Sequence, residues 1–134
     1  MSELETRILE LLSSEKDPEK LMADILRVLM LYNGVLWISE LYREVPMFHG
    51  TLGEERVENK DDINNAISKL VEMKILQIEE RLKGSFASEG FIREQLVYVT
   101  DQSFILKIVS KDSKFRKFIA ERERIFREIL GKKK

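Results

Sequence analysis

The stretch that decides the fold reads NKDDINNAISKLVEMKILQI at residues 59–78 and closes on LVYVT at residues 96–100. Its first part has the i, i+4, i+7, i+8 apolar spacing of an amphipathic helix, at Ile63, Ile67, Leu70 and Val71. After Lys74 the hydrophobic period changes to two, which indicates a strand. The stretch therefore predicts a short helix that leads directly into a β-hairpin.

The hairpin is predicted from two alternating runs. Apolar residues alternate along the first strand at Leu76, Ile78 and Leu82, and along the second at Ile92, Leu96 and Tyr98. Residues 84–90 read GSFASEG, and their glycines and serines favour a turn-rich tip. Phe86 lies at this tip, either as an incidental exposed aromatic or as a contact into a groove or a partner.

Two helices are expected ahead of this stretch. Ser2 can cap the first, with Glu5 as its capping-box partner. Its apolar stripe packs either on the chain's own core or against a second copy, and comprises Leu4, Ile8, Leu11 and Leu12. Asp17 and Pro18 suit the N-cap and first turn of the second helix, which Asn33-Gly34 ends. This second helix is apolar over more than half its circumference, so it should be the most buried.

A short strand and a short helix are expected next. Residues 35–38, VLWI, are rich in strand formers, and Trp37 is expected in the core, with an exposed binding anchor as the alternative. Ser39 can cap a helix over residues 40–45, which Pro46 ends. Residues 46–58 are then expected to form a long loop, or a loop with one short turn. His49, the only histidine, is expected there as a surface or half-buried residue, and no metal site is predicted from it.

The carboxyl-terminal third predicts two helices that begin after Thr100-Asp101 and break near residues 110–113, with one continuous helix as the alternative. The second has the 3-4 spacing of a coiled-coil seam at Phe115, Phe118, Arg122, Ile125 and Ile129. This seam either packs on the chain's own core or pairs with another copy. Two heptads are too few for a coiled coil on its own.

Composition limits the classes of protein that fit. A length of 134 residues suits one domain, divided into a helix at 1–16, a core at 17–100 and a helical extension at 101–134. The chain has no cysteine, which excludes disulfides and thiolate chemistry. No apolar run approaches a membrane span and the acidic amino end lacks a signal-peptide pattern, so a cytoplasmic protein is expected. The abundance of Ile, Glu and Lys is compatible with a thermophile.

The charge is unevenly distributed along the chain. Residues 101–134 hold eleven basic and five acidic side chains, whereas residues 60–76 hold three of each. Proteins that bind nucleic acid normally carry a basic surface, because phosphate neutralisation dominates their affinity. The basic charge of this chain lies outside the helix and hairpin described first.

Residues 18–100 resemble the winged helix-turn-helix superfamily in the order and apolar spacing of their elements. The resemblance implies a mainly α fold with a small antiparallel β-hairpin, in which residues 62–76 form the recognition helix and the turn into the wing. The added terminal helices resemble the dimerisation helices of small prokaryotic regulators. The implied dimerisation residues are Leu4, Ile8, Leu11, Phe115, Phe118, Arg122, Ile125 and Ile129.

In this superfamily the third helix enters the major groove of double-stranded DNA and the wing contacts its backbone or minor groove. The resemblance places polar and basic residues near bases or phosphates, namely Lys60, Asn64, Asn65, Ser68, Lys69, Lys74, Arg81, Lys83 and Arg93. Two departures stand out: the connection before the third helix is long, and Asp61 and Glu72 share that helix's exposed face.

Two functions remain open from the sequence. The first is a small homodimeric transcription regulator that binds DNA. The second is a winged-helix protein-interaction module in a larger assembly, which the neutral helix favours. The sequence has no catalytic motif, so no enzyme is predicted, and no cofactor is expected.

Overall fold

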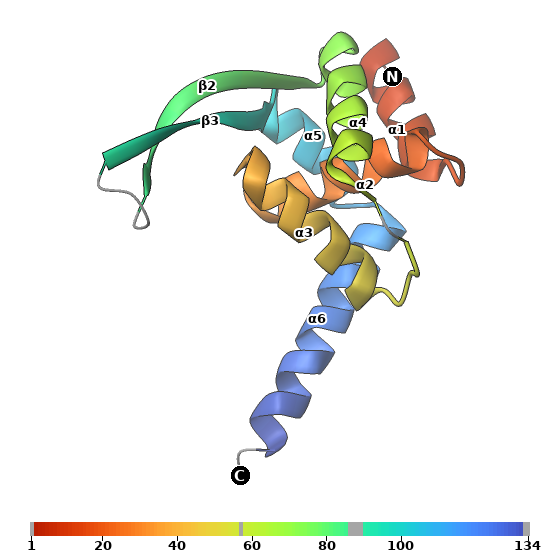
Figure 1. Cartoon of the computed structure of the whole chain (residues 1–134). Coiled ribbons are helices and arrows are strands. Elements are labelled where there is room, and N and C mark those ends of the chain that lie inside the picture. Colours follow the sequence, from red (N-terminus) through yellow and green to blue (C-terminus); the bar gives the residue numbers. More distant parts are fainter. Residues whose placement is uncertain (1, 57, 86–89, 133–134) are drawn as a thin grey trace.

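The computed structural model describes residues 2–56, 58–85 and 90–132 of the chain, which is mainly helical with a small antiparallel sheet (Figure 1). The helices are α1 (Glu3–Ser13), α2 (Glu19–Leu31), α3 (Ile38–Thr51), α4 (Lys60–Glu72), α5 (Gln102–Val109) and α6 (Ser113–Lys132). The strands are β1 (Val35–Trp37), β2 (Leu76–Ser85) and β3 (Gly90–Val99). The predicted helix-and-hairpin stretch is confirmed as α4, β2 and β3, whereas Phe86 at the predicted tip lies outside the described residues.

The three strands form one antiparallel sheet in the order β1-β3-β2. Leu36 pairs with Val97 and Leu76 with Val99, and all four side chains are buried. Ile92, Leu96 and Tyr98, which alternate along the second strand in the sequence, do not face the core. Val97 and Val99 are its buried residues, and the alternate residues point away. Residues 96–99 are all apolar or aromatic, so hydrophobic alternation does not indicate which side of this strand faces the core. The pairing with β1 determines it.

Helix α2 forms the centre of the core. Its residues 21–30 are all buried, and α1, α3, α4, α5 and β1 pack around it. The prediction that this is the most buried helix is confirmed. The run includes two ionisable side chains, Asp24 and Arg27, which must be neutralised by neighbours to be stable there.

Helix α1 packs within the chain. The Ser2 hydroxyl accepts a hydrogen bond from the Glu5 N–H, as predicted. Ile8 and Leu11 are buried against α2 and α5, and Leu4 is half-buried beside them. The expected dimerisation role of these three residues is therefore corrected: their apolar stripe is covered by the chain's own core.

Helix α3 is longer than predicted. It begins at Ile38, where the Glu40 carboxylate accepts from the Trp37 N–H, and runs through Pro46 to Thr51. A proline inside a helix removes one backbone hydrogen bond, which normally ends the helix. Here the turn beyond it buries Phe48 and His49, and these long-range contacts outweigh the local penalty. The predicted Ser39 cap and the loop starting at residue 46 are both wrong.

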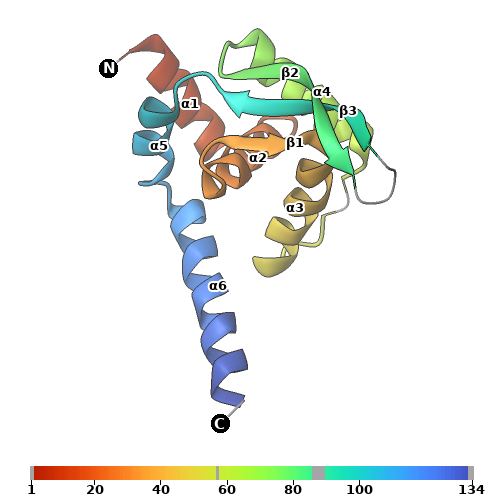
Figure 2. The same ribbon diagram turned by 90° about the vertical axis from the view of Figure 1, so that its left-hand side faces the viewer.

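Helices α5 and α6 are separate, as predicted. The Asp101 and Asp112 carboxylates cap them by accepting from the backbone N–H groups of Phe104 and Phe115. Phe115 is buried at the base of α6, and the helix then extends away from the rest of the molecule (Figures 1 and 2).

Gly34 joins α2 to the sheet at a point of close backbone approach. Its φ is +85°, its N–H donates to the Leu29 carbonyl at 2.8 Å, and its carbonyl accepts from the Val99 N–H at 2.9 Å. A Cβ at this position would lie 2.7 Å from Val99 Cγ2. Both the left-handed backbone and the lack of space for a Cβ atom therefore require glycine.

Replacing Gly34 with alanine is expected to lower the free energy of unfolding by about 2 to 4 kcal/mol. The left-handed backbone contributes about 1 to 2 kcal/mol and the overlap with Val99 about 1 to 3 kcal/mol. Urea denaturation followed by circular dichroism measures the change. Gly50→Ala is the control, because Gly50 lies in α3 in open space, and we expect it to alter stability by less than about 1 kcal/mol. Equal stability of the two variants would contradict this account.

Candidate functional site

The exposed side of α4 carries several of the predicted DNA-binding residues. Asn59 caps the helix, accepting from the Asp62 N–H, and the buried face of Ile63, Ala66, Ile67 and Leu70 packs toward α2. This orientation leaves the polar face outward, with five exposed residues: Lys60, Asn65, Ser68, Lys69 and Lys74. Lys74 follows the helix, in the turn into β2 with a φ of +63°.

Asn64 lies apart from this exposed group. It is half-buried, and its Oδ1 accepts a 2.6 Å hydrogen bond from the Tyr42 hydroxyl of α3. Together they line a groove of about 270 Å³ with Ser68 of α4 and Ile78 of β2. Asn64 therefore also has a structural task, which is to join α4 to α3.

The basic residues predicted on the hairpin each have an acidic neighbour. Arg81 pairs with Glu79 at 2.6 Å, and Arg93 lies 3.9 Å from Glu80. Lys83 contacts Glu94 at 3.2 Å and lies over the half-buried Trp37 ring. All three basic side chains lie on the hairpin, where the neighbouring carboxylates largely balance their positive charge.

The charge of α4 is also mixed. Asp61, Asp62 and Glu72 are exposed on the same helix as Lys60 and Lys69. The surface formed by α4 and the hairpin thus combines hydrogen-bonding groups with a near-neutral charge.

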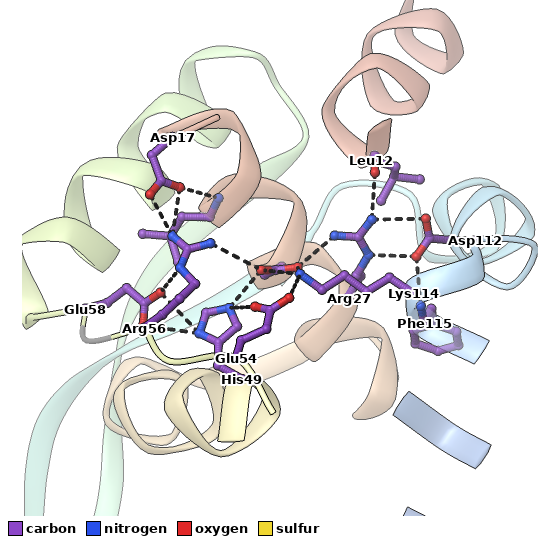
Figure 3. Close-up of polar contacts among 12 residues, drawn as sticks. Leu12, Asp17, Arg27, His49, Glu54, Arg56, Glu58, Asp112, Lys114 and Phe115 are labelled. Atoms are coloured by element: carbon purple, nitrogen blue, oxygen red, sulfur yellow. Dashed lines mark hydrogen bonds and ion pairs between the residues drawn. The ribbon is translucent and has the colours of Figure 1, made fainter. Parts of the chain in front are cut away.

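A second candidate site is a buried ionic cluster, which lies between α2, α3, the loop after α3 and the start of α6 (Figure 3). The prediction that His49 is a surface or half-buried loop residue is wrong, because its side chain is only 1% exposed. Its Nε2 lies 2.8 Å from Asp24 Oδ2, and its Nδ1 lies 3.1 Å from Glu58 Oε1. Both ring nitrogens thus face carboxylates.

Asp24 is the centre of this cluster. Its carboxylate contacts Arg27 Nη1 at 2.7 Å and Lys114 Nζ at 3.0 Å, in addition to His49. Burial by itself raises the pKa of Asp24, but the hydrogen bond from His49 and the charges of Lys114 and Arg27 outweigh it and lower the pKa from 3.8 to about 2. The carboxylate is therefore charged at neutral pH although it is fully buried.

Arg27 connects the cluster to α6 and α1. Its guanidinium donates to both oxygens of Asp112, at 2.7 and 3.0 Å, and to the Leu12 carbonyl at 2.8 Å. Burial lowers the pKa of Arg27, but Asp112 and Asp24 raise it above its ordinary value, so the side chain stays charged.

The loop between α3 and α4 supplies the remaining members. Glu54 contacts Lys114 at 2.8 Å, and Arg56 contacts Glu58 at 2.8 Å and the exposed Asp17 at 2.7 Å. These contacts fix the position of the loop that connects α3 to α4. Donor atoms of Asp24, His49 and Glu54 lie within 4.8 Å of one another, so this group can hold a metal ion.

Sequence reasoning missed this cluster, although one signal pointed to it. Asp24 and Arg27 interrupt a run of ten residues that is otherwise apolar, LMADILRVLM, and ionisable groups in such a run need partners. The partners are distant in sequence, on three other elements, so no local pattern identified them.

The sequence matches no known family model, and a search of curated proteins finds no significant match either. Within the described ranges, none of the helices combines the length and the apolar character needed to cross a bilayer. The functional reading consequently depends on the geometry of the two candidate sites.

The acid stability of the metal-free chain is expected to reflect Asp24. Because its pKa is lowered in the folded state, its contribution is fully present above pH 3.8 and is lost as the pH falls through about 2. A shift of this size corresponds to about 2 kcal/mol. Urea unfolding with EDTA present measures the free energy of unfolding between about pH 5 and pH 2. Over this range, the Asp24→Asn variant should lose about 2 kcal/mol less of that free energy than wild type does.

Asp61→Asn is the matched control for this measurement. Asp61 is an exposed residue of α4 that makes no hydrogen bond or ion pair within the described part of the chain. We expect it to retain the wild-type pH dependence. An Asp24→Asn variant with the full wild-type dependence would show that other carboxyls determine acid stability.

Proposed function

We propose that the chain is a winged helix-turn-helix protein that binds double-stranded DNA as a homodimer, with α4 as recognition helix and the β2–β3 hairpin as wing. The observation that carries this proposal is the exposed polar face of α4 beside a hairpin that extends away from the helices (Figure 1). The order α2, β1, α3, α4, β2, β3 and the strand order β1-β3-β2 support the same assignment.

The chemistry of the α4 face suits contact with DNA. Asn65 can bond an adenine edge, and Ser68 and Lys69 can bond bases or phosphates. All three are exposed and lie within two helical turns. Since acidic residues share this helix, a single copy would bind weakly, and two copies on adjacent half-sites would supply the affinity.

The dimer in this proposal forms through the outer part of α6. Phe118 is buried within the chain, as is Phe115, so these two predicted dimerisation residues are corrected to core residues. Further along the helix, Phe126, Ile129 and Leu130 are 60%, 50% and 60% exposed. These three residues lie on consecutive turns of a projecting helix. They form a continuous exposed apolar stripe that a second copy can bury.

A groove beside α6 offers a place for a second copy of this helix. It has a volume of about 280 Å³ and lies between the end of α2, α3 and α6. Tyr32, Met47, Ile125 and Ile129 are among its lining residues, with Arg122 at its edge. Because the stripe and the groove share residues, a two-fold pair of α6 helices would cover both on each copy.

A protein-interaction module is the second candidate function. It is favoured by Asp61, Asp62 and Glu72 on the exposed face of α4, since each would repel phosphate. The two functions differ in their response to salt and to duplex DNA.

Duplex DNA is expected to bind the wild-type chain at low salt, with affinity falling at least tenfold between about 50 and 200 mM salt. The double variant Lys69→Glu/Arg93→Glu should abolish this binding, because it reverses one exposed charge on α4 and one on the wing. Fluorescence anisotropy with a random-sequence duplex, followed by selection of preferred sites, measures both effects.

The control for this experiment is Lys107→Glu/Lys111→Glu, which makes the same change in net charge at exposed residues of α5 and the turn after it. It should bind with an affinity within about threefold of wild type. Equal loss in both variants would indicate non-specific attraction, and a dimer that fails to bind DNA at low salt would favour the protein-interaction module.

The double variant Phe126→Glu/Ile129→Glu is expected to be monomeric. Light scattering should give about twice the chain mass of 15.8 kDa for wild type and about once that mass for the variant, because charges on the stripe cannot be buried at a pairing interface. Leu9→Glu/Leu106→Glu is the control, since these side chains are 40% and 41% exposed on α1 and α5. A monomeric wild-type chain would contradict the α6 dimer.

A further inference from the structure

We propose that Asp24, His49 and Glu54 form a binding site for one divalent transition-metal cation of the Zn²⁺ class. The three donor atoms come from α2, α3 and the loop after α3. His49 Nε2 lies 2.8 Å from Asp24 Oδ2 and 3.8 Å from Glu54 Oε2. Two ligands on a tetrahedral Zn²⁺ lie roughly 3.4 Å apart, given bond lengths of about 2.1 Å. The observed separations are close to this value.

The second neighbour of His49 also fits metal binding. A ligating imidazole usually donates its other N–H to a carboxylate, which fixes the ring and its tautomer. Glu58 is in this position, with its oxygens 3.1 and 3.2 Å from His49 Nδ1. The Glu58 side chain is only 4% exposed, so it is held in place beside the ring.

Glu54 supplies an oxygen that lacks a hydrogen-bond partner. Its Oε1 contacts Lys114, whereas the Oε2 atom is buried and accepts no hydrogen bond within the described residues. This second oxygen is the one on the His49 side of the carboxylate. A buried acceptor without a donor is unfavourable, and a cation between Glu54 and His49 would satisfy it.

The ammonium group of Lys114 is the competitor for this position. It bridges Asp24 at 3.0 Å and Glu54 at 2.8 Å, where a cation shared by the two carboxylates would lie. Lys114 is 19% exposed and lines an open pocket of about 710 Å³ together with Lys117. Its four-carbon side chain can therefore turn into this pocket while the helix stays in place.

The charge of the cluster favours a divalent cation once Lys114 has turned away. Five carboxylates then face two guanidiniums, which leaves an excess of three negative charges, one of them on the exposed Asp17. The carboxylates belong to Asp17, Asp24, Glu54, Glu58 and Asp112, and the guanidiniums to Arg27 and Arg56. Arg27 stays on Asp24 Oδ1, so the metal would bind Oδ2, which lies 2.8 Å from His49 Nε2 and 3.8 Å from Arg56 Nη1. Mixed imidazole and carboxylate donors favour Zn²⁺ over Mg²⁺ or Ca²⁺.

The proposal predicts a change in Zn²⁺ affinity for one of two alanine variants of α6 and no change for the other. We expect the metal-stripped full chain to bind one Zn²⁺ in isothermal titration at about pH 7.5. Lys114→Ala should bind Zn²⁺ at least tenfold more tightly, because the competing ammonium is gone. Lys117→Ala, one turn along and outside the cluster, should bind as wild type does. If Lys114→Ala binds no more tightly than Lys117→Ala, the proposal is overturned.

His49 gives a direct test of the ligand set, because it is the only histidine of the chain and its imidazole signals need no assignment. Long-range ¹H–¹⁵N spectra should show a coordination shift at Nε2 on Zn²⁺ addition, because the metal replaces the Nε2 proton, and the imidazole proton should then lie on Nδ1, facing Glu58. His49→Gln should reduce the affinity at least 100-fold, with folding checked by circular dichroism. Unchanged His49 signals at saturating Zn²⁺ would assign the binding to surface carboxylates and overturn the proposal. This readout in wild-type protein applies even where His49→Gln does not fold.

Discussion

The buried carboxylate of Asp24 is the constraint on which the arrangement of the helices depends. It lies on the most buried helix with no exposure to solvent, where it pairs with Arg27 and Lys114 and contacts His49 at 2.8 Å. These partners come from α2, α3 and α6, so the three helices must meet at this point. A buried ion pair contributes little net stability compared with apolar packing, but losing one partner is strongly destabilising. Arrangements of α3 or α6 that separated these partners would leave the buried carboxylate unpaired and are therefore disfavoured.

The sequence predicted α4 and the hairpin because their signals are local. The apolar spacing of α4 and the change of period after Lys74 lie within about a dozen residues of one another. The Asn59 cap seen in the structure is local as well. The course of α3 could not be predicted in the same way. Pro46 is a local signal for the end of a helix, whereas the contacts that override it join His49 to Asp24, 25 residues away. Long-range contacts of this kind have no signature in a short window of sequence.

The candidate surface was predictable only in part for a related reason. Helical periodicity placed Asn65, Ser68 and Lys69 on the exposed face of α4, where the structure has them. The charge state of the hairpin depends on strand register, which the sequence alone did not provide. Register places Glu94 opposite Arg81 and diagonal to Lys83, which it contacts at 3.2 Å. Only the Arg81–Glu79 pair, two residues apart on β2, is local in sequence. The surface is consequently less basic than a list of its lysines and arginines indicates.

Helix α6 takes part in both proposals, and its two ends have separate tasks. Lys114 in the first turn belongs to the ionic cluster, while Phe126 and Ile129 lie three to four turns further on. Phe115 and Phe118 anchor the helix between these regions, with the Phe118 ring 4.8 Å from that of Phe48. The Asp112 cap also remains when the Lys114 side chain moves, because Arg27 holds its carboxylate. Exchange of the ammonium for a metal ion would therefore leave the helix direction unchanged, so the proposed metal site and the proposed pairing through α6 can be tested independently.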